Sequence, residues 1–364
     1  MLRSTALAPI ALALVGLAAC GGSTVPSAAP DAAPADAATP DAAPADAATP
    51  DAAEPDAAEP DAAATPDVAP TPDAAPDVPE PPIMSSSCDL LEAGTVTDFM
   101  VDGAPRSFIL TLPTGATAPG GRWPVVFSWH GFGDNAPSFN AAFSGAVNNA
   151  TMPFILVTPV STMLTPLTDP PGLDWDQLRV AGPNREARLF DAVLRCVDMR
   201  WGVDRDRVYT AGFSAGAILS DLLGVLRGDQ LAAVASFSGG YFSNPANPMT
   251  LGIARSFIAW PPLPAAHRYP QLLAYGGPRD MVSLGVATAR FDVFAANDVP
   301  YLRAAGHDVV ECNHNAAHTV PTAMRAQVIP FFAAHPRGRT PSAWGAALPA
   351  GMPSYCSFRA AGGM

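Results

Sequence analysis

One run near the middle of the chain constrains its fold most. At residues 207–216 a stretch rich in β-forming residues passes through the letters GFSAG directly into an apolar helical pattern. This is G-x-S-x-G between a strand and a helix, where flanking glycines allow a sharp turn and the serine hydroxyl projects above the strand end. The run predicts an α/β fold with Ser214 as a nucleophile. A glycine-rich turn without chemistry is the alternative.

The patterns on either side of this run repeat the same alternation. Apolar runs typical of buried strands occur at residues 106–112, 124–129, 154–158, 232–237, 271–275 and 308–312, and helical spacing occurs at residues 184–201, 215–226 and 322–334. Strands that alternate with helices form a mostly parallel sheet covered on both faces. The sequence therefore predicts a doubly wound sheet in a single catalytic domain at residues 87–364.

A serine hydroxyl is a weak nucleophile and needs a base that an acid orients. In α/β-hydrolases the acid and the histidine follow the nucleophile along the chain. Asp280 lies in the loop directly after the strand predicted at residues 271–275, so it is the predicted acid. Asp292 and Asp298 fall in a predicted helix, and Asp308 begins a strand at the wrong edge of the sheet.

The predicted base is His318, in the loop that follows the strand at residues 308–312. A loop of several residues is needed to return an imidazole over Ser214, and His318 has that reach. His314 is still close to the strand, and we expect it to make only a local polar contact. The other late histidines, expected on the surface, are His267, His307 and His335.

A hole for the oxyanion of a tetrahedral intermediate is predicted from two segments. Trp-His-Gly-Phe-Gly at residues 129–133 follows an apolar strand, at the place where this fold completes its oxyanion hole. The backbone N–H groups of Phe132 and Ala215 are the predicted donors. His130 precedes the nucleophile and is expected to brace the loop. A simple tight turn is the alternative.

The N-terminus follows the logic of a targeting signal. Arg3 precedes an apolar run at residues 6–19, which is shorter than a membrane-spanning helix and ends at Leu-Ala-Ala-Cys20. This resembles a bacterial lipoprotein signal peptide, residues 1–19, and implies export and lipidation of Cys20. The protein would then be held to a bacterial membrane, because two or three acyl chains form a stable anchor. An ordinary cleavage site beside an incidental cysteine is the alternative.

A linker is predicted at residues 20–86. The decapeptide PDAAPADAAT at residues 30–39 recurs at residues 40–49 and then decays. Regular proline blocks helix and sheet, and evenly spaced acids repel one another, so we expect a disordered, extended stalk. The net charge of −13 belongs to this tail, since residues 1–87 hold thirteen acids and one base, leaving twenty acids and nineteen bases. A nearly neutral domain argues against nucleic-acid binding.

Four cysteines remain in the predicted domain: Cys88, Cys196, Cys312 and Cys356. An even number in an exported chain predicts two disulfides, and the pairing stays open. No C-x-x-C spacing or clustered His/Cys pattern favours a metal site. We expect a monomer that needs neither metal nor cofactor.

Together these motifs resemble the polyhydroxybutyrate depolymerase-like esterases, a group that includes feruloyl and acetylxylan esterases. The similarity covers residues 106–334 and rests on His-Gly at residues 130–131, DRVYTAGFSAG at residues 206–216, a G-G-x-x-D acid loop and a late H-T-V-P. Two departures leave the substrate class open. Ala217 stands where the family commonly has a third glycine, and Tyr275 stands where its acid loop often has histidine.

The resemblance implies an extracellular Ser-His-Asp hydrolase of polymer-linked or aromatic carboxylic esters, which acts through an acyl-enzyme. Two alternatives remain open at the level of sequence. A serine peptidase on the same fold would use the same triad, although no separate propeller or cap domain fits in this length. A catalytically inactive surface-binding lipoprotein would also suit a stalk.

Overall fold

The computed structural model describes residues 80, 82–162, 174–178, 182–250, 258, 260–264, 268–284, 287–339, 341–345 and 347–362. The predicted signal peptide, Cys20 and residues 20–79 of the predicted linker lie outside these residues, as does His267.

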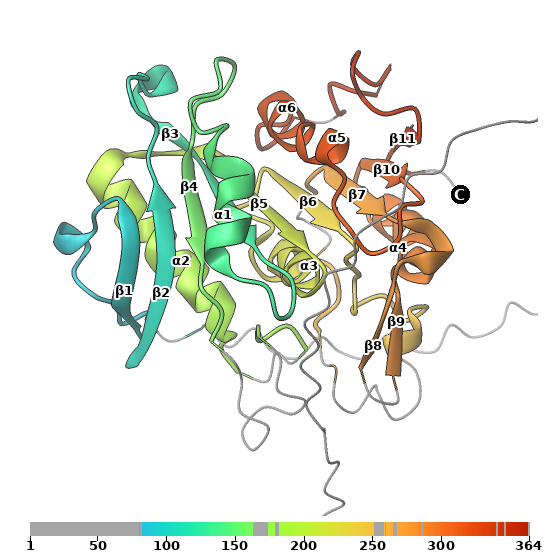
Figure 1. The fold of residues 1–364 in the computed structure, drawn as a ribbon, viewed down its shortest axis with the longest axis horizontal. Coiled ribbons are helices and arrows are strands. Elements are labelled where there is room, and N and C mark those ends of the chain that lie inside the picture. Colours follow the sequence, from blue (N-terminus) through green and yellow to red (C-terminus); the bar gives the residue numbers. More distant parts are fainter. Residues whose placement is uncertain are drawn as a thin grey trace, which may run out of the picture. The chain divides into compact units, whose positions relative to one another are not determined.

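A nine-stranded sheet runs through the described part of the chain, in the order β1-β2-β4-β3-β5-β6-β7-β10-β11 (Figure 1). Its strands are β1 (Gly94–Val101), β2 (Ala104–Thr111), β3 (Trp123–Trp129), β4 (Ile155–Pro159), β5 (Val203–Phe213), β6 (Ala233–Phe237), β7 (Gln271–Tyr275), β10 (Val309–Asn313) and β11 (Cys356–Arg359). The strands from β4 to β10 pair in parallel, and antiparallel strands flank them at both ends. The prediction of a mostly parallel α/β-hydrolase sheet is confirmed.

Helices cover both faces of the sheet. They are α1 (Ala136–Ser144), α2 (Arg185–Trp201), α3 (Ala215–Arg227), α4 (Phe291–Ala304), α5 (Thr322–Arg325) and α6 (Val328–Ala334). One core cluster joins α2 and α3 to the sheet, and another joins α1 and α6 to it. A separate antiparallel hairpin, β8 (Met281–Leu284) and β9 (Ala287–Arg290), follows β7 and precedes α4 along the chain, and lies below α4 in Figure 1.

Strand β3 shows why the central strands are continuously apolar. Val125 and Phe127 pack in the cluster with α2 and α3, whereas Val126 packs in the cluster with α1 and α6. All three side chains are fully buried. Successive residues of a strand point to opposite faces, so a sheet covered on both sides needs apolar residues at every position.

The last helix differs from its prediction. The helix expected at residues 322–334 is divided into α5 and α6, which are separated by Ala326 and Gln327. Pro330 explains the break, because its ring would clash with the carbonyl of residue 326 and it cannot donate an N–H to that carbonyl. The second helix instead begins at Val328, which places Pro330 in its first turn, where a missing N–H costs little.

The expectation of two disulfides is confirmed, and the structure supplies their pairing. Cys88 bonds to Cys196 and thereby joins the short 3-10 helix Cys88–Leu90 to α2. Cys312 bonds to Cys356 and joins β10 to the edge strand β11. One bridge therefore fastens the beginning of the domain and the other fastens its end.

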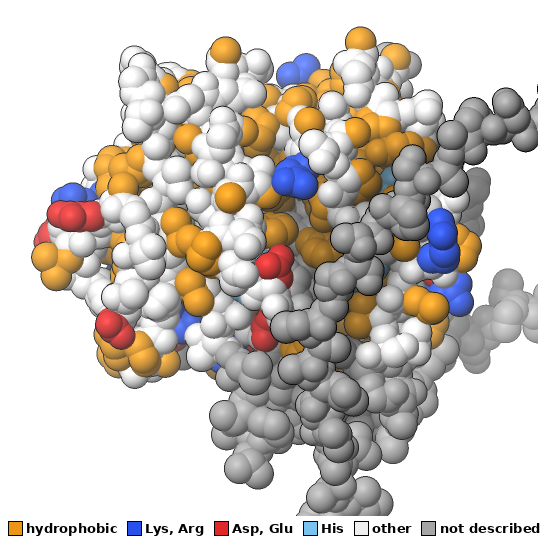
Figure 2. Space-filling model, viewed as in Figure 1, with side chains coloured by type: hydrophobic (Ala, Val, Ile, Leu, Met, Phe, Trp, Pro, Cys, Tyr) orange, Lys and Arg blue, Asp and Glu red, His pale blue; other side chains and the backbone are white. Residues whose placement is uncertain are grey.

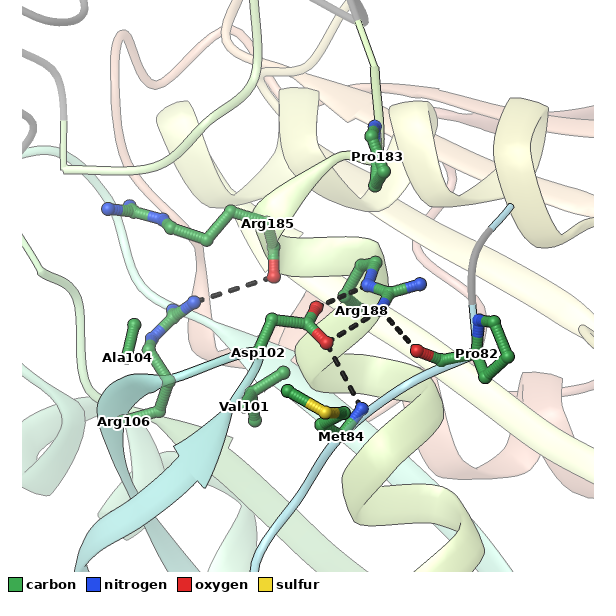
Figure 3. A pocket seen from close by; sticks show the side chains of 9 residues that line it. All are labelled: Pro82, Met84, Val101, Asp102, Ala104, Arg106, Pro183, Arg185 and Arg188. Atoms are coloured by element: carbon green, nitrogen blue, oxygen red, sulfur yellow. Dashed lines mark hydrogen bonds and ion pairs between the residues drawn. The ribbon is translucent and has the colours of Figure 1, made fainter.

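The folded part extends further towards the N-terminus than the predicted boundary at Ser87. Arg188 of α2 donates to Asp102, at 2.6 Å from its Oδ1, and to the carbonyl of Pro82 (Figure 3). Met84 also donates its N–H to Asp102, and the Arg188 bond lowers the pKa of this carboxyl. These groups line a cavity of about 570 Å³ that contains none of Ser214, Asp280 or His318. Residues before Ser87 are thus part of the packed domain.

The surface is consistent with the nearly neutral domain that the sequence predicts. On the face drawn in Figure 2, charged side chains stand singly or in small groups among hydrophobic and uncharged ones. Within the described ranges, no helix has the length and apolar character that a membrane crossing requires.

Candidate active site

Ser214 lies at the sharp turn between β5 and α3. Its backbone has φ 54° and ψ −119°, a conformation that costs a non-glycine residue free energy and persists only where the surroundings enforce it. Neighbouring glycines make the turn possible: a Cβ on Gly212 would lie 2.1 Å from the Gly216 carbonyl oxygen, and one on Gly216 would lie 2.1 Å from that of Trp129. The Ser214 N–H donates to the Phe237 carbonyl at 2.8 Å. The sequence GFSAG thus folds as a nucleophile elbow.

Asp280 is fully buried just beyond the end of β7. Its N–H closes a turn onto the Gly277 carbonyl, at 2.8 Å, and Gly277 has a φ of 72° that favours glycine. Oδ2 of the carboxylate accepts from the Gly276 N–H at 2.7 Å and from the Ser238 hydroxyl at 2.8 Å. With Oδ2 held in this way, Oδ1 faces the loop that carries His318.

His318 connects the other two residues. Its Nδ1 lies 2.6 Å from Oδ1 of Asp280, and its Nε2 lies 3.0 Å from Oγ of Ser214. With an ionised carboxylate, Nδ1–H donates to Asp280, which leaves Nε2 free to accept from the serine hydroxyl. The structure thus brings the predicted acid, base and nucleophile into one hydrogen-bonded chain.

The acid loop and the histidine loop touch directly. Ala317 donates its N–H to the carbonyl of Gly276 at 3.1 Å, and a Cβ on Gly276 would lie only 1.9 Å from the Ala317 carbonyl oxygen. Ala317 itself has a φ of 62°. This backbone contact sets the separation of the two loops. The absence of a side chain at Gly276 therefore allows the loops of Asp280 and His318 to approach each other.

Two aromatic rings hold the imidazole of His318. The ring of Phe291 stacks on it, with centroids 4.9 Å apart and planes inclined by 15°, and Phe213 lies 4.7 Å away at 33°. These contacts fix the plane of the imidazole. They also offer aromatic faces to the positive charge that a base acquires when it takes a proton.

The predicted oxyanion donors lie on the two segments expected. In the described part of the chain, neither the Phe132 N–H nor the Ala215 N–H donates to a protein acceptor. A Cβ on Gly131 would lie 3.4 Å from Cβ of Ser214, so the loop runs directly beside the nucleophile. Trp175 Nε1 donates to the His130 carbonyl at 2.9 Å and helps to hold this loop. Two unpartnered N–H groups beside a serine can stabilise an oxyanion.

The rival residues have other partners. His314 accepts the Ala316 N–H on Nδ1 at 3.2 Å, and burial lowers its pKa. Asp292 pairs with Arg290. Asp298 accepts from the Tyr241 N–H, and Asp308 accepts from the N–H groups of Ser342 and Ala361.

The expectation that His307 and His335 lie on the surface is wrong, since both are fully buried. Their ring nitrogens explain why burial is tolerated. His335 pairs through Nδ1 with the Phe331 carbonyl, at 2.7 Å, and through Nε2 with the Ser342 hydroxyl. His307 Nδ1 lies 2.9 Å from the Tyr269 carbonyl. Both histidines are therefore buried residues with hydrogen-bond partners inside the domain, which the sequence pattern does not predict.

Sequence reasoning missed Ser238 and Phe291, which contact Asp280 and His318 directly. Neither residue belongs to a motif, and no spacing in the sequence connects them to the triad. Within the described ranges, no group of three or more His, Cys, Asp or Glu side chains could hold a metal ion.

Comparison with known proteins agrees with this architecture. A family model described as esterase PHB depolymerase matches residues 106–252, and the resemblance predicted from the motifs is confirmed. The match supports a hydrolase of the esterase kind. It includes Ser214 and Phe132 but ends before Asp280 and His318, so geometry alone connects those two residues to the site.

Solved structures add information on the fold. The crystal structure of native sOPH has a TM-score of 0.59 at 19% identity and covers 74% of this chain and 94% of its own. Native pOPH has a TM-score of 0.59 at 17% identity and covers 75% and 96%. At such identities the likeness shows the α/β-hydrolase fold alone. No curated protein sequence matches the chain.

Proposed function

We propose that this chain is a serine carboxylic-ester hydrolase in which Ser214 is the nucleophile, His318 the general base and Asp280 the acid that orients it. One observation carries the proposal: Ser214, in a left-handed backbone at the strand–helix turn, lies 3.0 Å from a histidine whose other nitrogen lies 2.6 Å from a buried carboxylate. A base in hydrogen-bond reach of a nucleophile, itself oriented by a third group, is the arrangement that activates a hydroxyl.

The reaction follows from these contacts. Oγ of Ser214 attacks the ester carbonyl carbon while Nε2 of His318 takes the hydroxyl proton, and the resulting oxyanion is held by the N–H groups of Phe132 and Ala215. The C–O bond to the alcohol breaks as His318 returns the proton to the departing oxygen. Water then attacks the acyl-enzyme while His318 takes its proton. The bond between the acyl carbon and Oγ of Ser214 breaks, His318 returns the proton to Oγ, and the carboxylic acid leaves. Asp280 stabilises the imidazolium at both stages.

The substrate class is proposed from the family match and the surface beside the site. Phe132 is 47% exposed and follows Gly131, and Met281 is 50% exposed and follows Asp280. Exposed apolar side chains next in sequence to the oxyanion loop and to the proposed acid suit an apolar or aromatic ester. The family description names a polymer depolymerase, so polymer-linked esters belong to the same proposal.

We also propose export and lipid anchoring through Cys20, with residues 20–79 as the tether. The two disulfides support export, because such bonds persist in oxidising compartments. The apolar run before Cys20 and the small residues around it support lipidation.

The test combines a fluorophosphonate probe with a panel of p-nitrophenyl, feruloyl and peptide substrates. We expect the probe to add one phosphonyl group at Ser214, and esters to be hydrolysed in preference to peptides. Ser214→Ala should fold with an unchanged melting temperature and lower kcat by several powers of ten, because the triad acts as one unit. A Ser214→Ala variant that keeps more than about a tenth of the wild-type kcat would place the nucleophile elsewhere. Faster turnover of peptides would make the enzyme a peptidase.

A further inference from the structure

Ser238 occupies an unusual position directly after β6. It is only 1% exposed, and its backbone has a φ of 56°, a region that glycine adopts at less cost. Its N–H donates to the Ala274 carbonyl of the neighbouring strand β7, at 2.8 Å. Its hydroxyl donates to Oδ2 of Asp280, also at 2.8 Å.

This hydroxyl completes the hydrogen bonding of the Asp280 carboxylate. Oδ1 faces Nδ1 of His318, while Oδ2 accepts from Gly276 N–H and from Ser238 Oγ. The Gly276 donor belongs to the same loop as Asp280 and moves with it. Ser238 comes from another strand, and so it ties the carboxylate to the body of the sheet.

The loop that carries Ser238 is itself held by two buried carboxyl groups. Asp221 of α3 accepts from the Gly240 N–H, and Asp298 of α4 accepts from the Tyr241 N–H, each at 2.9 Å. Because Asp221 and Asp298 are buried, these hydrogen bonds resist displacement by water. They enforce the strained backbone that aims the Ser238 hydroxyl at Asp280.

We propose that Ser238 is a positioning residue for the reaction: its hydroxyl fixes the plane of the Asp280 carboxylate so that Oδ1 stays opposite Nδ1 of His318. The assignment rests on the proposed function of Ser214, Asp280 and His318. Without this donor the carboxylate can turn about its Cβ–Cγ bond, and the imidazole loses the partner that selects its tautomer. The chemical step should slow while substrate binding stays the same.

The test compares Ser238→Ala and Ser238→Gly with a matched control, Ser128→Ala. Ser128 is also a fully buried serine near the end of a parallel strand, but its hydroxyl bonds to Thr158 at 2.7 Å. We expect both Ser238 variants to lower kcat about 10- to 100-fold, the range found when an outer-shell partner that orients a functional side chain is removed, with KM changed less than about twofold. The control should retain about the wild-type kcat.

A second readout does not depend on turnover. The Nδ1–H proton between His318 and Asp280 should give a low-field proton NMR resonance in the wild type, which is lost or shifted upfield in both Ser238 variants and kept in the control. Ser238→Gly relieves the positive φ, so it provides the test if Ser238→Ala fails to fold.

The outcomes separate the two proposals. If the wild type hydrolyses no ester, the proposed function fails and the resonance still decides the role of Ser238. If turnover depends on Ser214 but both Ser238 variants keep more than about half the wild-type kcat and the resonance is unchanged, the positioning role is overturned. A raised KM at unchanged kcat would also overturn it, since the hydroxyl would then serve substrate binding.

Discussion

The two halves of the proposed active site are built in different ways. The nucleophile half comes from one contiguous segment, the end of β5 and the start of α3, and is shaped by close contacts of Gly212 and Gly216. The acid–base half is assembled from separate loops that follow β6, β7 and β10. The first therefore depends on local backbone sterics, and the second depends on the order of strands in the sheet.

Because of this difference, substitutions in the two halves should affect activity in different ways. A change in the elbow alters the attacking atom itself. A change in the loops can leave Ser214 in place and still disable the enzyme, because the loops set where His318 and Asp280 meet.

The largest effect should come from His318. His318→Ala should lower kcat nearly as much as Ser214→Ala, by several powers of ten, because the base and nucleophile act together. His314→Ala is the matched control from the same loop, and should cost less than about tenfold, since the His314 imidazole accepts from the Ala316 N–H of its own loop and contacts neither Ser214 nor Asp280 in the described hydrogen bonds. Steady-state kinetics on a p-nitrophenyl ester measures both. If kcat is retained in His314→Ala and lost in His318→Ala, the assignment of His318 as the base is supported. The reverse pattern overturns it.

Gly276→Ala should damage the acid–base half without touching the elbow. The new Cβ would lie 1.9 Å from the Ala317 carbonyl oxygen, so the two loops must move apart. We expect a loss of about 2 kcal/mol or more in unfolding free energy, and kcat lower by at least tenfold. Gly145→Ala is the control, because its added Cβ meets nothing within 4 Å and its φ is −64°. Normal kinetics in Gly276→Ala would show that the loop spacing is not critical.

Much of the site could be predicted because its signals are local. The strand–turn–helix setting predicts Ser214 as a candidate, and loops just past strand ends predict Asp280 and His318, and the structure places these three side chains in hydrogen-bond contact. Ser238 and Phe291 could not be predicted, since their contacts depend on β6, β7 and β10 being neighbours. That order is a tertiary property without a sequence pattern of its own.

The fold shows the same limit. The central strands are buried on both faces and gave clear apolar runs, whereas β1, β11 and the β8–β9 hairpin are partly exposed and gave none. The division between α5 and α6 depends on one residue, Pro330, because the helical spacing of apolar residues otherwise continues from residue 322 to residue 334. The predicted and observed secondary structure thus differ at the edge strands and at the interruption between α5 and α6. In these places the hydrophobic pattern of the sequence is weak or is overridden by a single residue.

Asp298, which holds the loop that carries Ser238, should make a smaller, pH-dependent contribution to the unfolding free energy. Burial raises its pKa to about 7, against hydrogen bonds from Asn244, the Tyr241 N–H and Asn247 that lower it. A raised carboxyl pKa favours folding at low pH, and this contribution is lost as the pH rises towards 7.

The matching variant is Asp298→Asn, which removes this titration. Between pH 5 and 7, the unfolding free energy of the wild type should fall relative to the variant by about 1 kcal/mol per pH unit, and change little above pH 7. Asp292→Asn, on the same helix, is the control. Its carboxyl pKa is lowered by Arg290, so it titrates below this range. Urea unfolding at several pH values measures both, and parallel curves for Asp298→Asn and wild type would contradict the assignment.

The smallest effect should come from shortening the linker. Deletion of residues 23–79 from a non-lipidated form should leave kcat unchanged and shift the melting temperature by less than about 2 °C, because the repeats offer no large apolar side chain to bury. Extending the deletion through Ser86 removes the contacts of Glu80 with Arg227 and of Pro82 with Arg188, and should lower the melting temperature further. Equal stability of the two truncations would show that these contacts contribute nothing.

If the protein is anchored through Cys20 as proposed, the Cys88–Cys196 bridge also has a mechanical consequence. Tension applied along the N-terminal tether enters the domain near Glu80 and is first opposed by ion pairs and hydrogen bonds to Arg227 and Arg188. If these yield, the pull reaches Cys88 and passes through a covalent bond into the middle of the sheet's covering helix α2. The edge strand β1 lies beyond that point along the chain, so shear flow or a moving polymer surface cannot peel it from the sheet while the disulfide holds.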